Sequence, residues 1–136
     1  MKVFIDTETT GLDPLHHSIL SACVGNKEIG YRTFHFRPDE DLTVDEKAMA
    51  VNNIDLDGIW GDQTLEFINH LGVLKEVYGE LEPIGHNYQF DMGFLYQILG
   101  KMGYGRYFSR RYEDTMIVAK FLDGVMERKD CKYSLK

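Results

Sequence analysis

The chain has little of several features that mark common classes of protein. It contains only two cysteines, Cys23 and Cys131, which lie far apart and form no Cys-x-x-Cys pair, so the sequence argues against a disulfide framework and against a structural zinc site. Positive charge is in deficit: the formal net charge of −7 and the pI of about 5.1 exclude a large basic surface that coats nucleic acid. A small metal-containing site for a nucleic-acid end is compatible with this charge. No apolar stretch approaches the roughly 20 residues of a membrane helix, and the first residues do not form a signal peptide. We therefore expect a soluble, cytoplasmic protein.

A single folded domain is expected for residues 1–136. This length and an apolar content of 43% are enough for one core but not for two, and the sequence has no repeat or linker. After a first strand, the patterns predict strands over 18–24 and 29–36, helices over 43–51 and 62–77, a strand over 82–86, and helices over 87–102 and 114–122. The two strands after the first are expected to pair as an antiparallel hairpin. This order of strands and helices predicts an α/β layered domain.

Two carboxylates follow the first apolar strand. The run Val3-Phe4-Ile5 is typical of a strand that is buried on both faces. Because strand side chains alternate, Asp6 and Glu8 are expected on one face, about 6–7 Å apart, with Thr7 on the other. Two like charges at the end of a core strand repel each other, so a pair of Mg²⁺ or Mn²⁺ ions is a natural partner. A solvated strand end is the alternative.

A third carboxylate lies on a later helix. If Asn87 caps this helix, Asp91 lies about one turn inside it and shares a stripe with Phe94, Leu95, Ile98 and Met102. An aspartate in the first turn also suits the helix dipole, but that role does not require the apolar face. Burial of a carboxylate is costly unless it is paired or bound to a metal ion.

Two stretches together resemble a known enzyme family. Residues 4–12, Phe-Ile-Asp-Thr-Glu-Thr-Thr-Gly-Leu, and residues 85–91, Gly-His-Asn-Tyr-Gln-Phe-Asp, resemble the first two motifs of the DEDD exonucleases. The match is to the DEDDh, DnaQ-like branch, which includes the proofreading (epsilon) subunit of bacterial DNA polymerase III. The Asp114-Thr115 pair is similar to one that starts a later helix in that branch. The resemblance implies a ribonuclease H-like fold, with a mixed central sheet flanked by helices, and metal-dependent removal of nucleotides from a 3′ end.

The resemblance also implies roles for individual residues. Asp6 and Glu8 would bind metal ions, with Asp6 bridging both, and Asp91 would hold the second ion. Two such ions, roughly 3.5–4 Å apart, activate the attacking water and stabilise the leaving 3′ oxygen.

Further residues of the motifs are expected at the substrate. Thr9, Asn87 and Phe90 resemble residues that contact the terminal nucleotide, and Leu12 resembles an apolar wedge between the last two bases. Simpler readings stay open: a helix cap for Asn87, a core position for Phe90 and a turn for Leu12. His86 is interpreted as a packed histidine at a strand end in preference to a catalytic base.

The third motif of the family is not found in the 136 residues. The segment Tyr133-Ser134-Leu135 resembles the lead-in to it, with Ser134 as the cap of a helix, and a histidine base and a fourth carboxylate would follow. We therefore expect a C-terminally truncated domain that lacks the last helix, with activity reduced by about 10²–10⁴ for want of the base. Single-stranded DNA is the favoured substrate. An enzyme that trims short oligoribonucleotides, a non-catalytic module that binds nucleic-acid ends, a polymerase partner and a homo-oligomer are left open.

Overall fold

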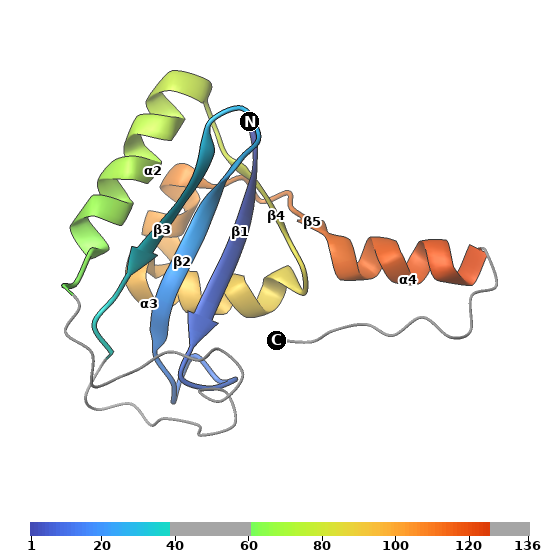
Figure 1. Ribbon diagram of the computed structural model, residues 1–136, viewed down its shortest axis with the longest axis horizontal. Helices are drawn as coiled ribbons and strands as arrows, with labels where there is room; N and C mark the ends of the chain where they lie inside the picture. Colours follow the sequence, from blue (N-terminus) through green and yellow to red (C-terminus); the bar gives the residue numbers. More distant parts are fainter. Residues whose placement is uncertain (39–60, 126–136) are drawn as a thin grey trace.

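The computed structural model describes residues 1–38 and 61–125, and within them a five-stranded sheet and three helices (Figure 1). The elements are β1 (Lys2–Thr9), β2 (Ile19–Asn26), β3 (Gly30–His35), α2 (Thr64–Tyr78), β4 (Glu82–Gly85), α3 (Tyr88–Tyr107), β5 (Glu113–Asp114) and α4 (Thr115–Val125). The helix expected over 43–51 and the segment around Ser134 lie outside the described residues. Over the residues that are described, no helix is long and apolar enough to span a membrane.

The sheet is mixed and has the strand order β3-β2-β1-β4-β5. β1 pairs antiparallel with β2 and parallel with β4, while β2 and β3 form the expected antiparallel hairpin. The side chain of Asn26 organises the hairpin turn, because its oxygen accepts hydrogen bonds from the backbone N–H groups of Glu28 and Ile29. The strand predicted over 82–86 is β4, and the short β5 continues the parallel part of the sheet.

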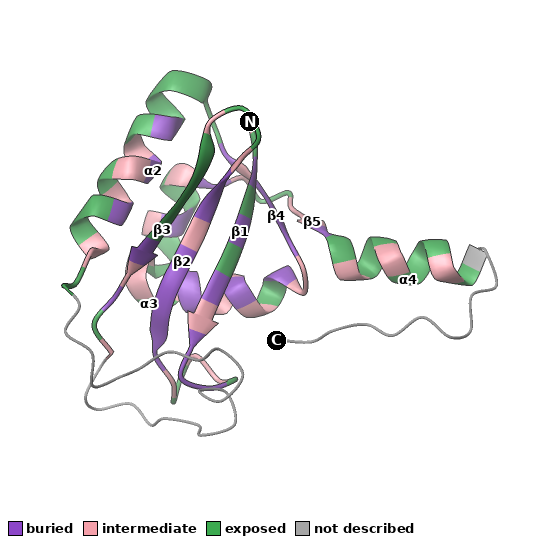
Figure 2. Cartoon of the chain, viewed as in Figure 1, coloured by how far each residue is buried: buried purple, intermediate pink, exposed green. Residues whose placement is uncertain are grey.

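Helices α2 and α3 lie against the same face of the sheet, and the core lies between the helices and that face (Figure 1). Residues of β1 that point to this face are buried, whereas Phe4 on the opposite face is 45% exposed (Figure 2). The prediction of a strand buried on both faces was therefore wrong. In the described part of the chain, no helix packs over the second face, so β1 has the alternating pattern of a half-covered strand.

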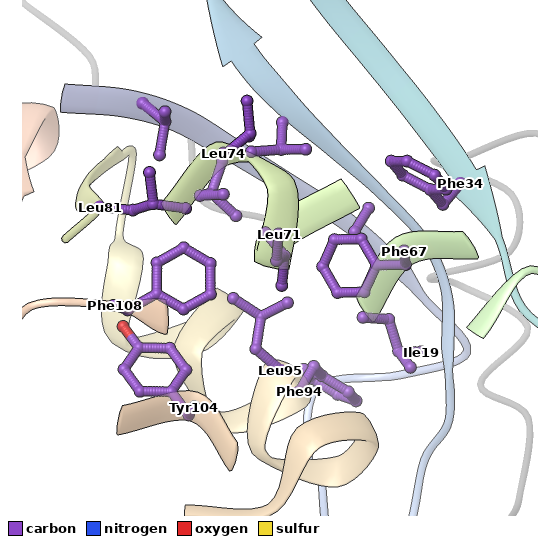
Figure 3. Close-up of a cluster of buried hydrophobic side chains, with 14 of the residues drawn as sticks. Ile19, Phe34, Phe67, Leu71, Leu74, Leu81, Phe94, Leu95, Tyr104 and Phe108 are labelled. Atoms are coloured by element: carbon purple, nitrogen blue, oxygen red, sulfur yellow. The ribbon is translucent and has the colours of Figure 1, made fainter. Parts of the chain in front are cut away.

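The spacing of Leu65, Ile68, Leu71, Leu74 and Val77 in the sequence predicts the buried stripe of helix α2, and this prediction holds only for Leu71 and Leu74. Phe67, Leu71 and Leu74 are buried, while Leu65 and Val77, which were expected in the core, are 73% and 64% exposed. Residues spaced by three drift around a helix of 3.6 residues per turn, whereas positions i, i+4 and i+7 stay on one face. Figure 3 shows this buried stripe pointing into the core.

Helix α3 extends to Tyr107 and contains a break at Gly100, where φ is 69°. A helix end near residue 102 followed by a glycine-rich turn was expected, and this was wrong, because residues 101–107 are helical and the break lies earlier, at Gly100, where glycine adopts positive φ without a steric penalty. The predicted apolar stripe holds for Phe94 and Leu95, which are buried, but not for Met102, which is 81% exposed. Met102 follows the break, so it does not continue the stripe that begins at Asp91.

Candidate active site

The first two acidic side chains lie at the carboxyl end of β1 on the open face of the sheet. Thr7 is buried on the core side, and its neighbours Asp6 and Glu8 are exposed and half-buried, as the alternation predicted. The register between β1 and β2 shifts between Glu8 and Thr9, which marks a β-bulge beside the site. Bulges bend a strand locally and re-aim its side chains. Burial raises the pKa of Glu8 above its ordinary value.

A groove of about 260 Å³ lies on the same open face beside Asp6. It exists because β4 runs parallel to β1, with Phe4 opposite Ile84, so that the carboxyl ends of both strands meet. His86 follows β4 and lines the groove together with Asp6. Gly85 allows this close approach: a Cβ atom there would lie 2.7 Å from Cδ1 of Tyr88 and 3.3 Å from the backbone oxygen of Ile5.

Asp91, in the first turn of α3, is completely buried. The Thr7 hydroxyl, on the core side of β1, donates a hydrogen bond to Asp91 Oδ1 at 2.5 Å. Burial raises the pKa of Asp91 to about 7; hydrogen bonds from Thr7 lower it in part, and the negative charges of Glu8 and Asp114 raise it. The predicted core-facing position is confirmed, and the charged form of this carboxylate is strongly disfavoured where it lies.

The three carboxylates therefore surround the end of one strand, two on its open face and one beneath it. Across the described ranges, no three His, Cys, Asp or Glu side chains already stand at the spacing of a metal site. The chemistry of the set nevertheless fits a hard divalent cation, because the ligands are carboxylates and Asp91 lies within the electrostatic range of Glu8. A bound cation would offset both the burial of Asp91 and its repulsion by Glu8.

The residue before α3 is not the cap that its sequence suggested. Asn87 has a left-handed backbone, with φ of 57°, and its side chain makes no capping hydrogen bond. The carboxylate of Asp114 takes this role instead and accepts hydrogen bonds from the backbone N–H groups of Asn87 at 2.9 Å and Tyr88 at 3.1 Å. It also accepts one from Met116 at 3.0 Å and so caps α4, close to the helix start predicted at residue 114. One carboxylate thus fixes the starts of two helices next to the site.

The other residues expected at the substrate lie in different environments. Leu12 is 59% exposed on the loop after β1, which suits an apolar side chain that meets a ligand. Phe90 is half-buried and its ring packs against Phe94 with centroids 5.1 Å apart. Thr9 is buried, and its hydroxyl donates a hydrogen bond to the backbone oxygen of Gly11 at 2.6 Å, which braces the turn that carries Leu12.

Gln97, which no sequence pattern singled out, holds this loop in place. The side-chain amide of Gln97, on α3, donates hydrogen bonds to the backbone oxygens of Pro14 at 2.8 Å and His17 at 2.6 Å. Its oxygen accepts a hydrogen bond from the backbone N–H of Ile19 at 2.9 Å. Gln97 belongs to neither motif, and its partners are about 80 residues away in sequence. No local signal identifies it.

Comparison with known proteins gives a consistent result. Residues 3–135 match the family described as Exonuclease (RNase_T). The PolC-type DNA polymerase III of Oceanobacillus iheyensis is 31% identical over 123 residues, and that of Halalkalibacterium halodurans is 32% identical over 124 residues. Each match covers 88% of this chain but only 8% of the relative, so the chain spans a small part of these polymerases.

Solved structures of exonuclease I have a similar fold. The E. coli enzyme in complex with a dT13 oligonucleotide has a TM-score of 0.69 at 15% identity, over 99% of this chain and 32% of that chain. The enzyme from Methylocaldum szegediense has a TM-score of 0.67 at 19% identity, over 94% of this chain and 30% of that chain. The expected ribonuclease H-like fold is confirmed by these likenesses. Because the family match takes in nearly the whole sequence, the chain belongs to the RNase_T exonuclease family, in its DnaQ-like branch.

Proposed function

We propose that this domain is a 3′–5′ exonuclease that uses two divalent ions, Mg²⁺ or Mn²⁺. The observation that supports this most directly is the position of Asp91, a fully buried carboxylate that is hydrogen-bonded to Thr7 between the two acidic residues of β1. Burial disfavours the ionised form of this carboxylate and raises its pKa, and buried carboxylates with raised pKa values are concentrated at functional sites. Membership of the exonuclease family supports the same reaction class.

In this proposal the residues that would hold the ions are Asp6 and Glu8, on the open face of β1, and Asp91, on its core side. When bound, the ions supply a nucleophilic water and stabilise charge on the leaving oxygen. Thr7 positions Asp91 through its hydroxyl group. The bulge after Glu8 sets the direction of the Glu8 side chain. The carboxylates must be ionised to act as ligands, which couples metal binding to loss of the Asp91 proton.

The substrate that we propose is the 3′ end of single-stranded DNA. A relative of the same fold, E. coli exonuclease I, has been solved in complex with a dT13 oligonucleotide, which supports this choice. Leu12 would lie between the last two bases, and Asn87 and Phe90 would contact the terminal nucleotide. The exposure of Leu12 and the lack of a capping bond from the Asn87 side chain support these roles.

A polypeptide of these 136 residues is proposed to turn over slowly. No histidine in it matches the family's third motif, and His86, which lines the groove with Asp6, is hydrogen-bonded through Nδ1 to the Thr115 hydroxyl at 3.1 Å. Loss of a general base lowers the rate of such reactions by about 10²–10⁴.

The experiment that tests this function is digestion of a 5′-labelled single-stranded DNA oligonucleotide by the purified chain with Mn²⁺. Stepwise shortening from the 3′ end is expected, and EDTA, Asp6→Asn and Asp91→Asn should abolish it. Glu76→Gln, an exposed substitution on α2, is the matched control and should cut normally. Cleavage that survives both aspartate substitutions would place the chemistry elsewhere. An RNA oligonucleotide in parallel separates the exoribonuclease alternative, and binding without cutting would favour the non-catalytic one.

A further inference from the structure

The groove beside Asp6 continues along the open face of the sheet as an aromatic surface. Phe4 lies two residues before Asp6 on the same face of β1, about 6–7 Å away along the strand. Phe4 and Tyr31 both line the groove, and they are 45% and 58% exposed. Neither ring belongs to the carboxylate set or to the residues assigned to the terminal nucleotide. Exposed aromatic side chains next to a site are typical of an interaction surface.

The charges in this groove show which part of a ligand it can hold. Among the described residues that line it there is no lysine or arginine, and Asp6 is the only acid. His86 is the one side chain there that can gain a positive charge. The phosphate groups of a nucleic acid therefore find no fixed positive charge beside Phe4 and Tyr31, and are drawn instead to metal ions held by the carboxylates. The part of the groove away from Asp6 suits a flat apolar group.

The place of the groove restricts what can occupy it. Asp6 forms part of its wall, so any molecule that fills the groove lies against the proposed metal site. A protein segment in this position would cover Asp6 and exclude the substrate. The single strand that the domain is proposed to cut has to lie against Asp6, and its bases are flat groups that stack on aromatic side chains whatever their sequence. The occupant that agrees with both the lining and the place of the groove is this strand.

We propose that Phe4 and Tyr31 form a stacking surface for bases of the single strand upstream of its terminal nucleotide. This inference rests on the proposed function, which puts the 3′ end of the strand at Asp6, with the terminal nucleotide on the α3 side. Tyr31 is on β3, two strands away from β1, which is about 10 Å. Stacked nucleotides follow one another at about 3.4 Å, so this distance spans about three of them. The two rings therefore contact different bases of one strand.

Fluorescence anisotropy of a 5′-labelled thymidine octanucleotide, in EDTA to prevent cutting, measures the contribution of each ring. Phe4→Ala and Tyr31→Ala should each weaken binding by about 5–150-fold, the usual effect of removing a stacked aromatic side chain. Tyr31→Phe keeps the ring and should bind as the parent chain does. Tyr78→Ala is the matched control, because Tyr78 is 47% exposed but lies on α2, which covers the other face of the sheet. A parent chain that does not bind, or alanine variants that bind as tightly as the parent, would overturn the proposal.

An abasic scan of the same oligonucleotide locates the contacts without relying on any variant. Removal of one base at a time should weaken binding to the parent chain at two positions, about three nucleotides apart. Phe4→Ala should then have no further effect on the oligonucleotide that lacks the base over Phe4, because the two changes remove the same contact. Additive losses at every position would overturn the proposal. Neither measurement needs cleavage. Coupled losses from a chain that never cuts would refute the proposed exonuclease and support the stacking surface, whereas normal cutting without coupling would do the reverse.

Discussion

The buried carboxylate of Asp91 destabilises the metal-free fold, and this can be measured with Asp91→Asn. The substitution removes the charge with almost no change in volume, and the amide oxygen can still accept the hydrogen bond that Thr7 donates to Oδ1. We therefore expect the variant to lose activity and metal binding but to be more stable than the parent chain at neutral pH without metal.

The size and sign of the effect follow from the pKa of Asp91. Its value in the folded chain is about 7, against about 3.9 for an unfolded aspartate, so the folded chain keeps a proton that the unfolded chain has lost. The contribution of this retained proton to the free energy of unfolding is fully present below about pH 4 and is lost as the pH rises through 7. A difference of about three pKa units corresponds to roughly 4 kcal/mol. The buried amide group of the asparagine costs about 1–3 kcal/mol, so the net gain at pH 8 is about 1–3 kcal/mol.

Urea unfolding in EDTA between pH 5 and pH 8 provides the measurement. The free energy of unfolding of the parent chain should fall by about 2–3 kcal/mol relative to Asp91→Asn over this range. Glu76→Gln, which removes an exposed acid from α2, should follow the parent chain. Parallel pH profiles for the parent and Asp91→Asn would show that the buried carboxylate carries no such cost, and the reasoning would fail. Addition of Mn²⁺ should then stabilise the parent and not the variant.

Two further substitutions test how the site is held in place. Gln97→Ala removes two hydrogen bonds to the loop that carries Leu12 and one to Ile19 at the start of β2, so the free energy of unfolding should fall by about 1–3 kcal/mol and KM for single-stranded DNA should rise more than kcat falls. Gln89→Ala is the control from the same helix: it removes a hydrogen bond to the Tyr112 hydroxyl, away from the loop, and should leave KM unchanged. Gly85→Ala places a Cβ atom 2.7 Å from the ring of Tyr88, and urea unfolding should show a loss of about 1–3 kcal/mol. A fully stable Gly85→Ala protein would mean that β4 and α3 separate without cost.

Much of the fold was predictable because local patterns determine it. The hairpin of β2 and β3 follows from two apolar strands and a short polar turn, and Asn26 makes the turn contacts that its residue type suggests. The wrong predictions concern residues whose burial depends on tertiary packing. An unbroken apolar run at Phe4 cannot indicate whether a helix packs over that face. In α2, the large ring of Phe67 packs on Phe34 with centroids 5.3 Å apart, so the side of the helix that carries Phe67 is buried and Leu65 is exposed.

In the candidate site, too, positions set by local spacing were predictable and contacts between distant segments were not. The core-facing position of Asp91 was predictable, because it follows from helical spacing relative to Phe94 and Leu95. The capping role expected for Asn87 was wrong because Asp114, 27 residues further along the chain, supplies the capping oxygens from β5. Such contacts depend on the order of strands in the sheet, which residue spacing alone does not reveal.

Thr7 connects the two halves of the proposed metal site. It lies between Asp6 and Glu8 in sequence, but its hydroxyl points to the opposite side of β1 and donates to Asp91. Thr7→Val keeps the shape and removes the donor, so the pKa of Asp91 should rise above its present value, because the Thr7 hydrogen bond lowers it. Metal binding requires the ionised carboxylate, and the acidic limb of Mn²⁺ affinity should therefore move to higher pH. Calorimetric titration with Mn²⁺ from pH 6 to pH 9 measures this shift, with Thr7→Ser, which keeps the donor, as the control. If the valine and serine variants bind Mn²⁺ with the same pH dependence, the residue between the two acids serves packing alone, and the link from the strand to the buried carboxylate plays no part in assembling the site.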